Sequence, residues 1–104
     1  MYMLEQIIRF ERSKRPHKKY TAYIQNRKTK KIRRLHFGDN RYQQYKDRTP
    51  LRLYRSLNHG SRKRMRNYFN RHSGIANREE AIAHEKRKSN NLYTPKLLSH
   101  IYLW

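Results

Sequence analysis

Cysteine is absent from this chain of 104 residues, which excludes a disulfide framework and any zinc site built on thiolates. Long apolar runs are absent as well, since no stretch approaches the ~18–20 residues that a membrane-spanning helix needs. Residues 1–10 are partly apolar, but Glu5 and Arg9 interrupt them and no small-residue cleavage site follows. We therefore expect neither a transmembrane segment nor a secretory signal.

Acidic residues are also scarce. Seven Asp and Glu stand against 27 Lys and Arg, which gives a formal net charge of +20. Hydrophobic residues make up 35% of the chain, below the ~45–50% of ordinary soluble domains. A thin core and strong self-repulsion predict that the isolated protein is poorly ordered at low salt. Binding to a polyanion or to an acidic protein surface would then complete its folding.

The distribution of residue types predicts an α+β fold, in which a small β-hairpin or sheet precedes several short helices and the basic segments are extended. We expect residues 1–19 to form a basic N-terminal segment and residues 20–104 to form a single small domain. Residues 2–10 could form an edge strand or a short helix, and Ile7, Ile8 and Phe10 favour the strand. Pro16 excludes a helix in the basic linker that follows them.

Two stretches rich in β-formers, residues 20–25 and 32–37, flank a polar segment. This pattern predicts a hairpin over residues 20–37, closed by Gly38-Asp39-Asn40. Short helices are expected over residues 41–104 because N-capping residues and apolar stripes recur there. The expected helical segments are a turn over 41–46 capped by Asp39 or Asn40, a helix begun by Thr49-Pro50, a helix from Ser61 to His72, a helix from Asn77 to about Lys88, and a last helix begun by Thr94-Pro95.

The basic run over residues 9–34 alternates cations with Tyr20 and Tyr23. Such a surface suits contact with phosphates, because each neutralised phosphate releases counterions. The alternative is a solvated charged ribbon that only keeps the protein soluble. The residues that we expect to contact a polyanion or an acidic partner are Arg12, Lys14, Arg15, Lys18, Lys19, Arg27, Lys28, Lys30, Lys31, Arg33, Arg34, Arg62, Lys63 and Arg66.

The helix expected over residues 61–72 places its arginines opposite an apolar stripe. A helix of this kind can enter a nucleic-acid groove, but no preceding helix completes a helix-turn-helix unit. The interpretation that we favour pairs its arginines with Asp39 and Asp47, which are the only acids between Glu11 and Glu79. Asp39 and Asp47 are therefore expected to be structural acids.

Six histidines raise the question of a nuclease, because Asn58-His59-Gly60 and Asn70-Arg71-His72 resemble fragments of a His-Asn-His pattern. Such a site needs a metal held by several ligands and a base that activates water. Acids are too few here, and no pair of ligands has a convincing helical spacing. We expect no enzymatic activity, no metal, no cofactor and no small-molecule substrate.

The most apolar stretch of the chain lies at its end, over residues 97–104. It either folds back to cover the hairpin, which is the alternative that we favour, or docks into a neighbouring subunit as a desolvated anchor. The residues concerned are Leu97, Leu98, Ile101, Tyr102 and Trp104.

Three blocks of sequence resemble a family of short basic proteins from large, nucleocytoplasmic-type double-stranded DNA viruses of algae and protists. The blocks run from Phe37 to Asp47, from His59 to Gly74, and over the closing Tyr-Leu-Trp, and the resemblance extends over residues 18–104. It implies a viral origin and a place in the virion after synthesis in the host cytoplasm or nucleus. It identifies no active residues.

We therefore expect a small basic structural protein of a virion: a minor capsid protein that bridges neighbouring capsid or other virion subunits. The alternative is a non-specific nucleic-acid-binding protein that organises the viral genome, with DNA or RNA as its partner. Tyr and Leu are spread along the chain instead of being segregated from a low-complexity basic tail, and this favours the capsid hypothesis.

Overall fold

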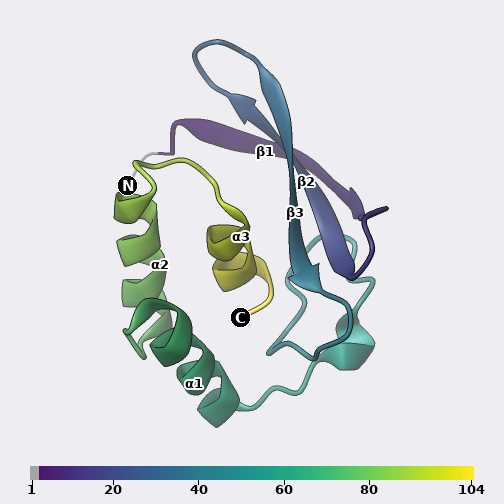
Figure 1. The fold of residues 1–104 in the computed structure, drawn as a ribbon, viewed down its shortest axis with the longest axis vertical. Helices are drawn as coiled ribbons and strands as arrows, with labels where there is room; N and C mark the ends of the chain where they lie inside the picture. The colour runs from purple at the N-terminus through teal and green to yellow at the C-terminus, as the bar shows by residue number, and fades with distance from the viewer. Residues whose placement is uncertain (1–2) are drawn as a thin grey trace.

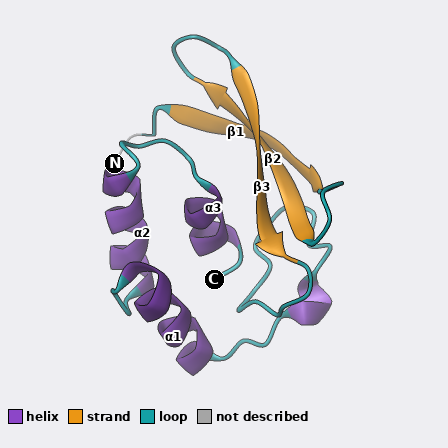
Figure 2. Ribbon diagram, in the orientation of Figure 1, coloured by secondary structure: helices purple, strands orange, loops and turns teal. Residues whose placement is uncertain are grey.

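The computed structural model describes residues 3–104 and shows an antiparallel sheet followed by helices, which confirms the predicted α+β class (Figures 1 and 2). Three strands form the sheet in the order β1-β2-β3. The strands are β1 (Glu5–Arg12), β2 (Lys18–Asn26) and β3 (Ile32–Asp39). The helices are a single 3-10 turn η1 (Arg55–Leu57), α1 (Arg62–Ser73), α2 (Arg78–Lys88) and α3 (Pro95–Tyr102).

The hairpin predicted over residues 20–37 is present as β2 and β3, and β1 pairs with the other edge of β2. The expected boundary between residues 19 and 20 therefore falls inside β2, and most of the N-terminal segment belongs to the same sheet as the hairpin. Pro16 lies in the short turn that joins β1 to β2. The first residue of the strand predicted over residues 2–10 lies outside the described residues.

The core lies between the sheet and α3, and α1 and α2 lie beyond α3 (Figure 1). Tyr20, Ala22 and Ile24 alternate along β2 and point to this side of the sheet, where they meet Leu98 and Leu103. Gly38 is required at the end of β3: its φ is +78°, and a Cβ there would lie 2.8 Å from Leu103 Cδ1.

The predicted helix boundaries after residue 60 are confirmed by their capping contacts. The side chains of Ser61, Asn77 and Thr94 each accept a hydrogen bond from the backbone N–H three residues later, at 3.2, 3.0 and 3.1 Å. Gly74 ends α1 in the left-handed conformation, with φ +68°. Local side-chain chemistry thus determines where these three helices begin.

The helix predicted to begin at Thr49-Pro50 does not form, and only η1 appears in its place. An α-helix would direct the N–H groups of Leu53 and Tyr54 to the carbonyls of residues 49 and 50. Instead, Leu53 N–H donates to the Tyr20 hydroxyl at 2.8 Å and Tyr54 N–H donates to the Asp47 carboxylate at 3.1 Å. These two side-chain acceptors take the place of the backbone carbonyls that an α-helix would use.

The helical turn predicted over residues 41–46 is also wrong. Asp39 does cap the chain there, through a 2.9 Å bond from Arg41 N–H, but it supports a single turn. Gln44 then forms an isolated parallel bridge with Asn58.

Within residues 3–104, no helix has the length and apolar character needed to cross a membrane.

Candidate functional site

The face of the sheet opposite the core carries no helix among the described residues (Figure 1). Strand pairing places nine side chains on this surface, because directly opposed residues share a face. We call it the open sheet face. Its residues are Gln6, Arg9, Glu11, Thr21, Tyr23, Gln25, Ile32, Arg34 and His36.

Tyr23 lies at the centre of the open sheet face, between an arginine on each neighbouring strand. The Arg9 guanidinium lies 4.0 Å from the centroid of the Tyr23 ring, and Arg34 is the paired residue on β3. The Tyr23 hydroxyl donates a 2.8 Å hydrogen bond to Glu11, which also accepts from Arg9 at 3.3 Å. The Arg9 guanidinium thus forms a cation–π contact over the Tyr23 ring, and Glu11 bonds to both side chains.

His36 lies on the same face, near the turn that joins β1 to β2, and hydroxyl groups contact its ring. Its Nδ1 is 2.7 Å from Thr21 Oγ1 and 3.3 Å from Ser13 Oγ. Burial lowers the pKa of His36, and the nearby charges of Arg15, Arg34 and Lys18 lower it further. Burial first, and the neighbouring cations second, therefore favour the neutral form of the imidazole.

Five of the seven acids are buried or bonded to other groups of the protein, and one of them, Glu11, offsets part of the charge of Arg9 on the open sheet face itself. Burial alone would raise the pKa of Glu5, but bonds from Arg33 at 2.7 and 2.9 Å and from Tyr93 N–H lower it. Hydrogen bonds from Arg41 lower the pKa of Asp39 to about 2. The five acids are Glu5, Glu11, Asp39, Asp47 and Glu85. The other two, Glu79 and Glu80, lie in the first turn of α2.

Two of the cations predicted to contact a polyanion have structural roles instead. Lys19 is 2% exposed, and its ammonium group donates to the Gln44 side chain and to the Tyr42 carbonyl. Burial lowers the pKa of Lys19 to about 8, although the charges of Asp47 and Asp39 oppose this shift. Arg33 is held by Glu5 and by the Tyr93 carbonyl at 2.6 Å.

The remaining predicted cations fall into separate groups. Arg12 bonds to the Tyr54 hydroxyl at 3.1 Å. Arg27 bonds to the Met3 carbonyl and to Gln6 beside the β2–β3 turn. Lys14, Arg15 and Lys18 are exposed at one end of the sheet, and Lys28, Lys30 and Lys31 are exposed at the other end. Arg62, Lys63 and Arg66 are exposed on α1, away from the sheet (Figure 1).

The predicted pairing with arginines of the helix over residues 61–72 is wrong for both aspartates, although Asp39 does pair with an arginine elsewhere in the chain. Asp39 forms a 2.8 Å ion pair with Arg41, and not with an arginine of α1. Asp47 is 3% exposed, and the hydrogen bonds given to its carboxylate come from uncharged groups of Tyr20, Thr49 and Tyr54. Asp47 organises the loop after the sheet, where its position depends on Tyr20.

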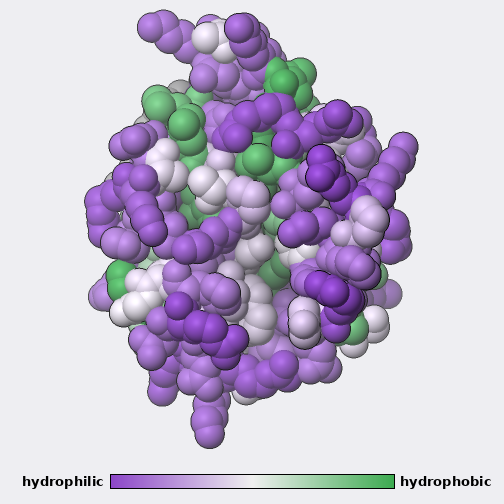
Figure 3. Space-filling model, viewed as in Figure 1, coloured by the Kyte–Doolittle hydropathy of each residue, from purple (hydrophilic) through white to green (hydrophobic). Residues whose placement is uncertain are grey.

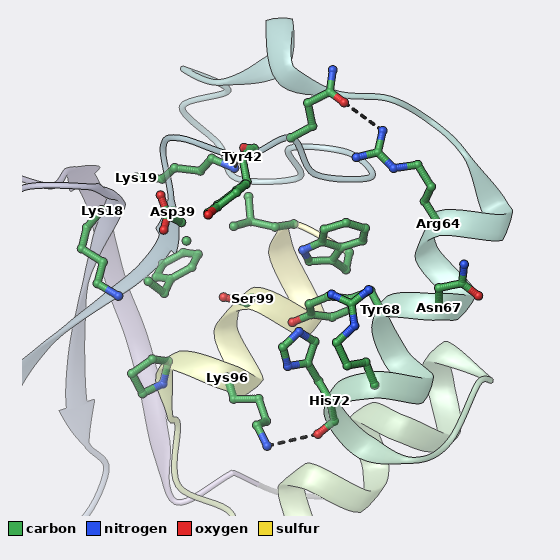
Figure 4. Close-up of a pocket in the computed structure, with 17 residues that line it drawn as sticks. Lys18, Lys19, Asp39, Tyr42, Arg64, Asn67, Tyr68, His72, Lys96 and Ser99 are labelled. Atoms are coloured by element: carbon green, nitrogen blue, oxygen red, sulfur yellow. Dashed lines mark hydrogen bonds between the residues drawn. The ribbon is translucent and has the colours of Figure 1, made fainter.

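A cleft of about 790 Å³ lies between the end of β3, the loop that follows it, α1 and α3 (Figure 4). Arg64, Asn67, Tyr68 and Arg71 line it from α1, and Lys96 lines it from α3. Tyr68 stacks on Trp104 in this cleft, with 4.3 Å between ring centroids and an angle of 3° between their planes.

Sequence reasoning missed the cleft cations Arg64, Arg71 and Lys96. The signal for the first two was present, because a spacing of seven residues returns to nearly the same side of a helix. Arg64 and Arg71 flank the apolar stripe through Tyr68, whereas the predicted Arg62, Lys63 and Arg66 do not line the cleft. The contribution of Lys96 depends on tertiary packing and has no comparable signal.

The apolar C-terminal segment closes the core of this chain. Leu97 and Leu98 are fully buried, and Ile101, Tyr102 and Trp104 are partly buried. Tyr102 packs edge-on against Phe10, with ring centroids 4.8 Å apart. Of the two alternatives for this segment, the structure supports folding back.

A buried polar network joins the three helices. The Ser73 hydroxyl donates to Glu85 at 3.0 Å and lies 2.8 Å from His100 Nε2, while His100 Nδ1 lies 2.9 Å from the Tyr68 hydroxyl. Burial lowers the pKa of His100 to about 4. Glu85 bonds to the serine and not to the imidazole, so the group lacks the order of a nucleophile, base and orienting acid. Among residues 3–104, no three potential ligand side chains are grouped to hold a metal ion.

Comparison with protein-family models, with curated proteins and with solved structures gives no match for this chain.

Proposed function

We propose that this chain is a non-specific nucleic-acid-binding protein that contacts its partner through the open sheet face and the cations at the two ends of the sheet. The observation that carries the proposal is the position of Tyr23 between Arg9 and Arg34, at the centre of a sheet face that carries no helix among the described residues. Bases stack on aromatic rings and guanidinium planes, and the surrounding cations attract phosphates.

The distribution of acids supports this choice. With 27 Lys and Arg against seven Asp and Glu, a phosphate that approaches the sheet meets a net positive field, although Glu11 offsets part of the charge of Arg9 on the open sheet face. Hydrophilic residues also cover most of the molecular face seen in Figure 3, and hydrophobic residues show only in small patches. The face seen in that view therefore offers no large apolar patch of the kind that marks an apolar protein interface.

The core position of Leu97 and Leu98 bears on the choice between the two sequence hypotheses. The segment that contains them was the candidate anchor for a neighbouring capsid subunit, but both side chains are buried within this chain. This removes a specific argument for the capsid-bridging role. A place in the virion, as a protein that organises the genome, stays part of the proposal and rests on the sequence resemblance alone.

The proposal is tested by fluorescence anisotropy with labelled DNA of two unrelated sequences, and with polyglutamate as an acidic control polymer. We expect similar affinities for the two DNA sequences and weaker binding to polyglutamate, because a polypeptide carboxylate offers no base to stack on Tyr23. Equal binding to DNA and polyglutamate would show that charge alone accounts for the affinity, and would contradict base stacking on Tyr23. Strong preference for one DNA sequence would contradict non-specific binding.

A further inference from the structure

The cleft beside α1 is a second concentration of cations and aromatic rings, and the open sheet face does not include it. Figure 4 shows Lys18, Asp39 and Tyr42 on one side of the cleft and Arg64, Asn67 and His72 on the other, with Lys96 and Ser99 projecting from α3. Its volume of about 790 Å³ lies within the ~300–1,000 Å³ that is typical of pockets for small-molecule ligands.

The charge of the cleft is strongly positive and poorly compensated. Arg64 bonds to the neutral Gln43 side chain at 2.8 Å, and Lys96 bonds to the His72 carbonyl at 3.1 Å while lying 3.9 Å from Glu85. The Arg71 side chain has no hydrogen-bond or ion-pair partner among the described residues. Asp39 is the only carboxylate side chain among the described lining residues, and Arg41 already engages both of its oxygens. The cleft therefore favours a ligand with more than one negative charge.

The cleft also contains aromatic rings on which a planar ligand could stack. Tyr42 is 64% exposed at its edge, so one large ring is open to solvent and to a ligand. Tyr68 and Trp104 form a stacked pair in the wall. An exposed ring close to several uncompensated cations suits a ligand that combines a planar ring with phosphate.

We propose that the cleft holds one nucleotide unit of a single-stranded nucleic acid, with its base against Tyr42 and its phosphates near Arg71, Lys96 and Arg64. This inference rests on the proposed function and adds a strand preference to it. A base in an intact duplex is stacked and paired, so it cannot enter a cleft until it is released. The cleft consequently favours single strands over duplexes of equal length.

Trp104 provides a direct readout, because it lines the cleft and is the single tryptophan of the chain. The experiment titrates the intact protein with an oligothymidine and with a duplex of equal length, and follows tryptophan emission alongside anisotropy. We expect the single strand to change Trp104 emission in a saturable manner, and the duplex to bind with little change. Equal emission changes for both would overturn the cleft assignment.

A matched pair of variants on one helix tests the residues. Arg71→Gln removes a charge inside the cleft, whereas Arg66→Gln removes the same charge from α1 outside it. Arg71→Gln should weaken single-strand binding by roughly tenfold and Arg66→Gln by less than about twofold. Tyr42→Ala, at an exposed position, should weaken single-strand binding by about tenfold with little effect on duplex binding. Equal effects of Arg71→Gln and Arg66→Gln would overturn the inference.

The same titrations separate this inference from the proposed function. If neither nucleic acid binds at low salt, the proposed function fails and the cleft assignment fails with it. If both bind and Trp104 emission stays constant, only the cleft assignment fails.

Discussion

The hydroxyl of Tyr20 donates a 2.5 Å hydrogen bond to the carboxylate of Asp47, and this buried contact joins the central strand to the loop that follows the sheet. The same hydroxyl accepts from Leu53 N–H, and the same carboxylate accepts from Thr49 and from Tyr54 N–H. Burial, together with the bond to Asp47, raises the pKa of Tyr20 to about 12. One pair of side chains thus satisfies the backbone of a segment that forms little regular structure.

Asp47→Asn should therefore destabilise the fold. The amide group would place a donor where the carboxylate accepts from several donors at once, so at least one buried bond is lost, at a cost of roughly 2–4 kcal/mol. Asp39→Asn is the matched control, because its exposed pair with Arg41 contributes about 0–1 kcal/mol. Urea unfolding measures both, and equal losses would contradict the central role of Asp47.

Acidification should destabilise the protein through His100. The pKa of this buried imidazole is lowered to about 4, against ~6.5 in an unfolded chain. Between these values the unfolded state binds a proton that the folded state does not. Stability should therefore fall as pH drops from 6.5 toward 4, by up to ~1.4 kcal/mol per unit from this residue.

The measurement is urea unfolding at several pH values for the wild type, His100→Asn and His84→Gln. The first variant should show a shallower dependence on pH, even if it is less stable overall. The second removes a histidine from α2 outside the network of Tyr68, Ser73 and Glu85. A slope that is unchanged in His100→Asn would show that this histidine titrates normally.

Truncation after residue 96 should unfold the protein. It removes Leu97, Leu98 and Leu103, which are all buried, so DNA binding by a folded sheet would be lost together with the fold. Leu98→Ala is the milder test and should cost roughly 2–5 kcal/mol. Circular dichroism and thermal melting check both variants, and a truncated chain that melts cooperatively at the wild-type temperature would contradict this account of the core.

Much of the helical part of the fold could be predicted from the sequence because its signals are local. Ser61, Asn77 and Thr94 each form their capping bond within three residues along the chain. The strands were also predictable, since β-formers on both sides of a polar turn carry the hairpin pattern.

The middle segment and much of the site could not be predicted, because distant residues determine them. The helix expected at Thr49 is replaced by bonds to Tyr20, which lies far away in sequence. In the sequence, Lys19 cannot be told from the other cations of the basic run, yet in the fold it is buried and its ammonium group donates to Gln44. Helical spacing groups Arg64, Tyr68 and Arg71 on one side of α1, but the cleft that they line forms only when α1 and α3 pack near the end of β3.

DNA binding should weaken steeply with salt. If about six phosphates are engaged, the logarithm of the affinity should fall with the logarithm of salt concentration at a slope near −5, on the order of 0.9 per phosphate. Anisotropy titrations at four or more salt concentrations give this slope. A slope near zero would exclude phosphate contacts as the main source of affinity.

The most direct test of the account compares two double variants of equal charge in one DNA titration. Arg9→Gln with Arg34→Gln removes the cations beside Tyr23, and Glu11 keeps its bond from the Tyr23 hydroxyl. Arg87→Gln with Lys88→Gln removes the same charge from the end of α2. We predict that the first variant weakens binding by at least tenfold and reduces the salt slope by about 1–2, whereas the second has less than about a threefold effect. Equal losses in the two variants, with both proteins folded, would contradict binding through the open sheet face.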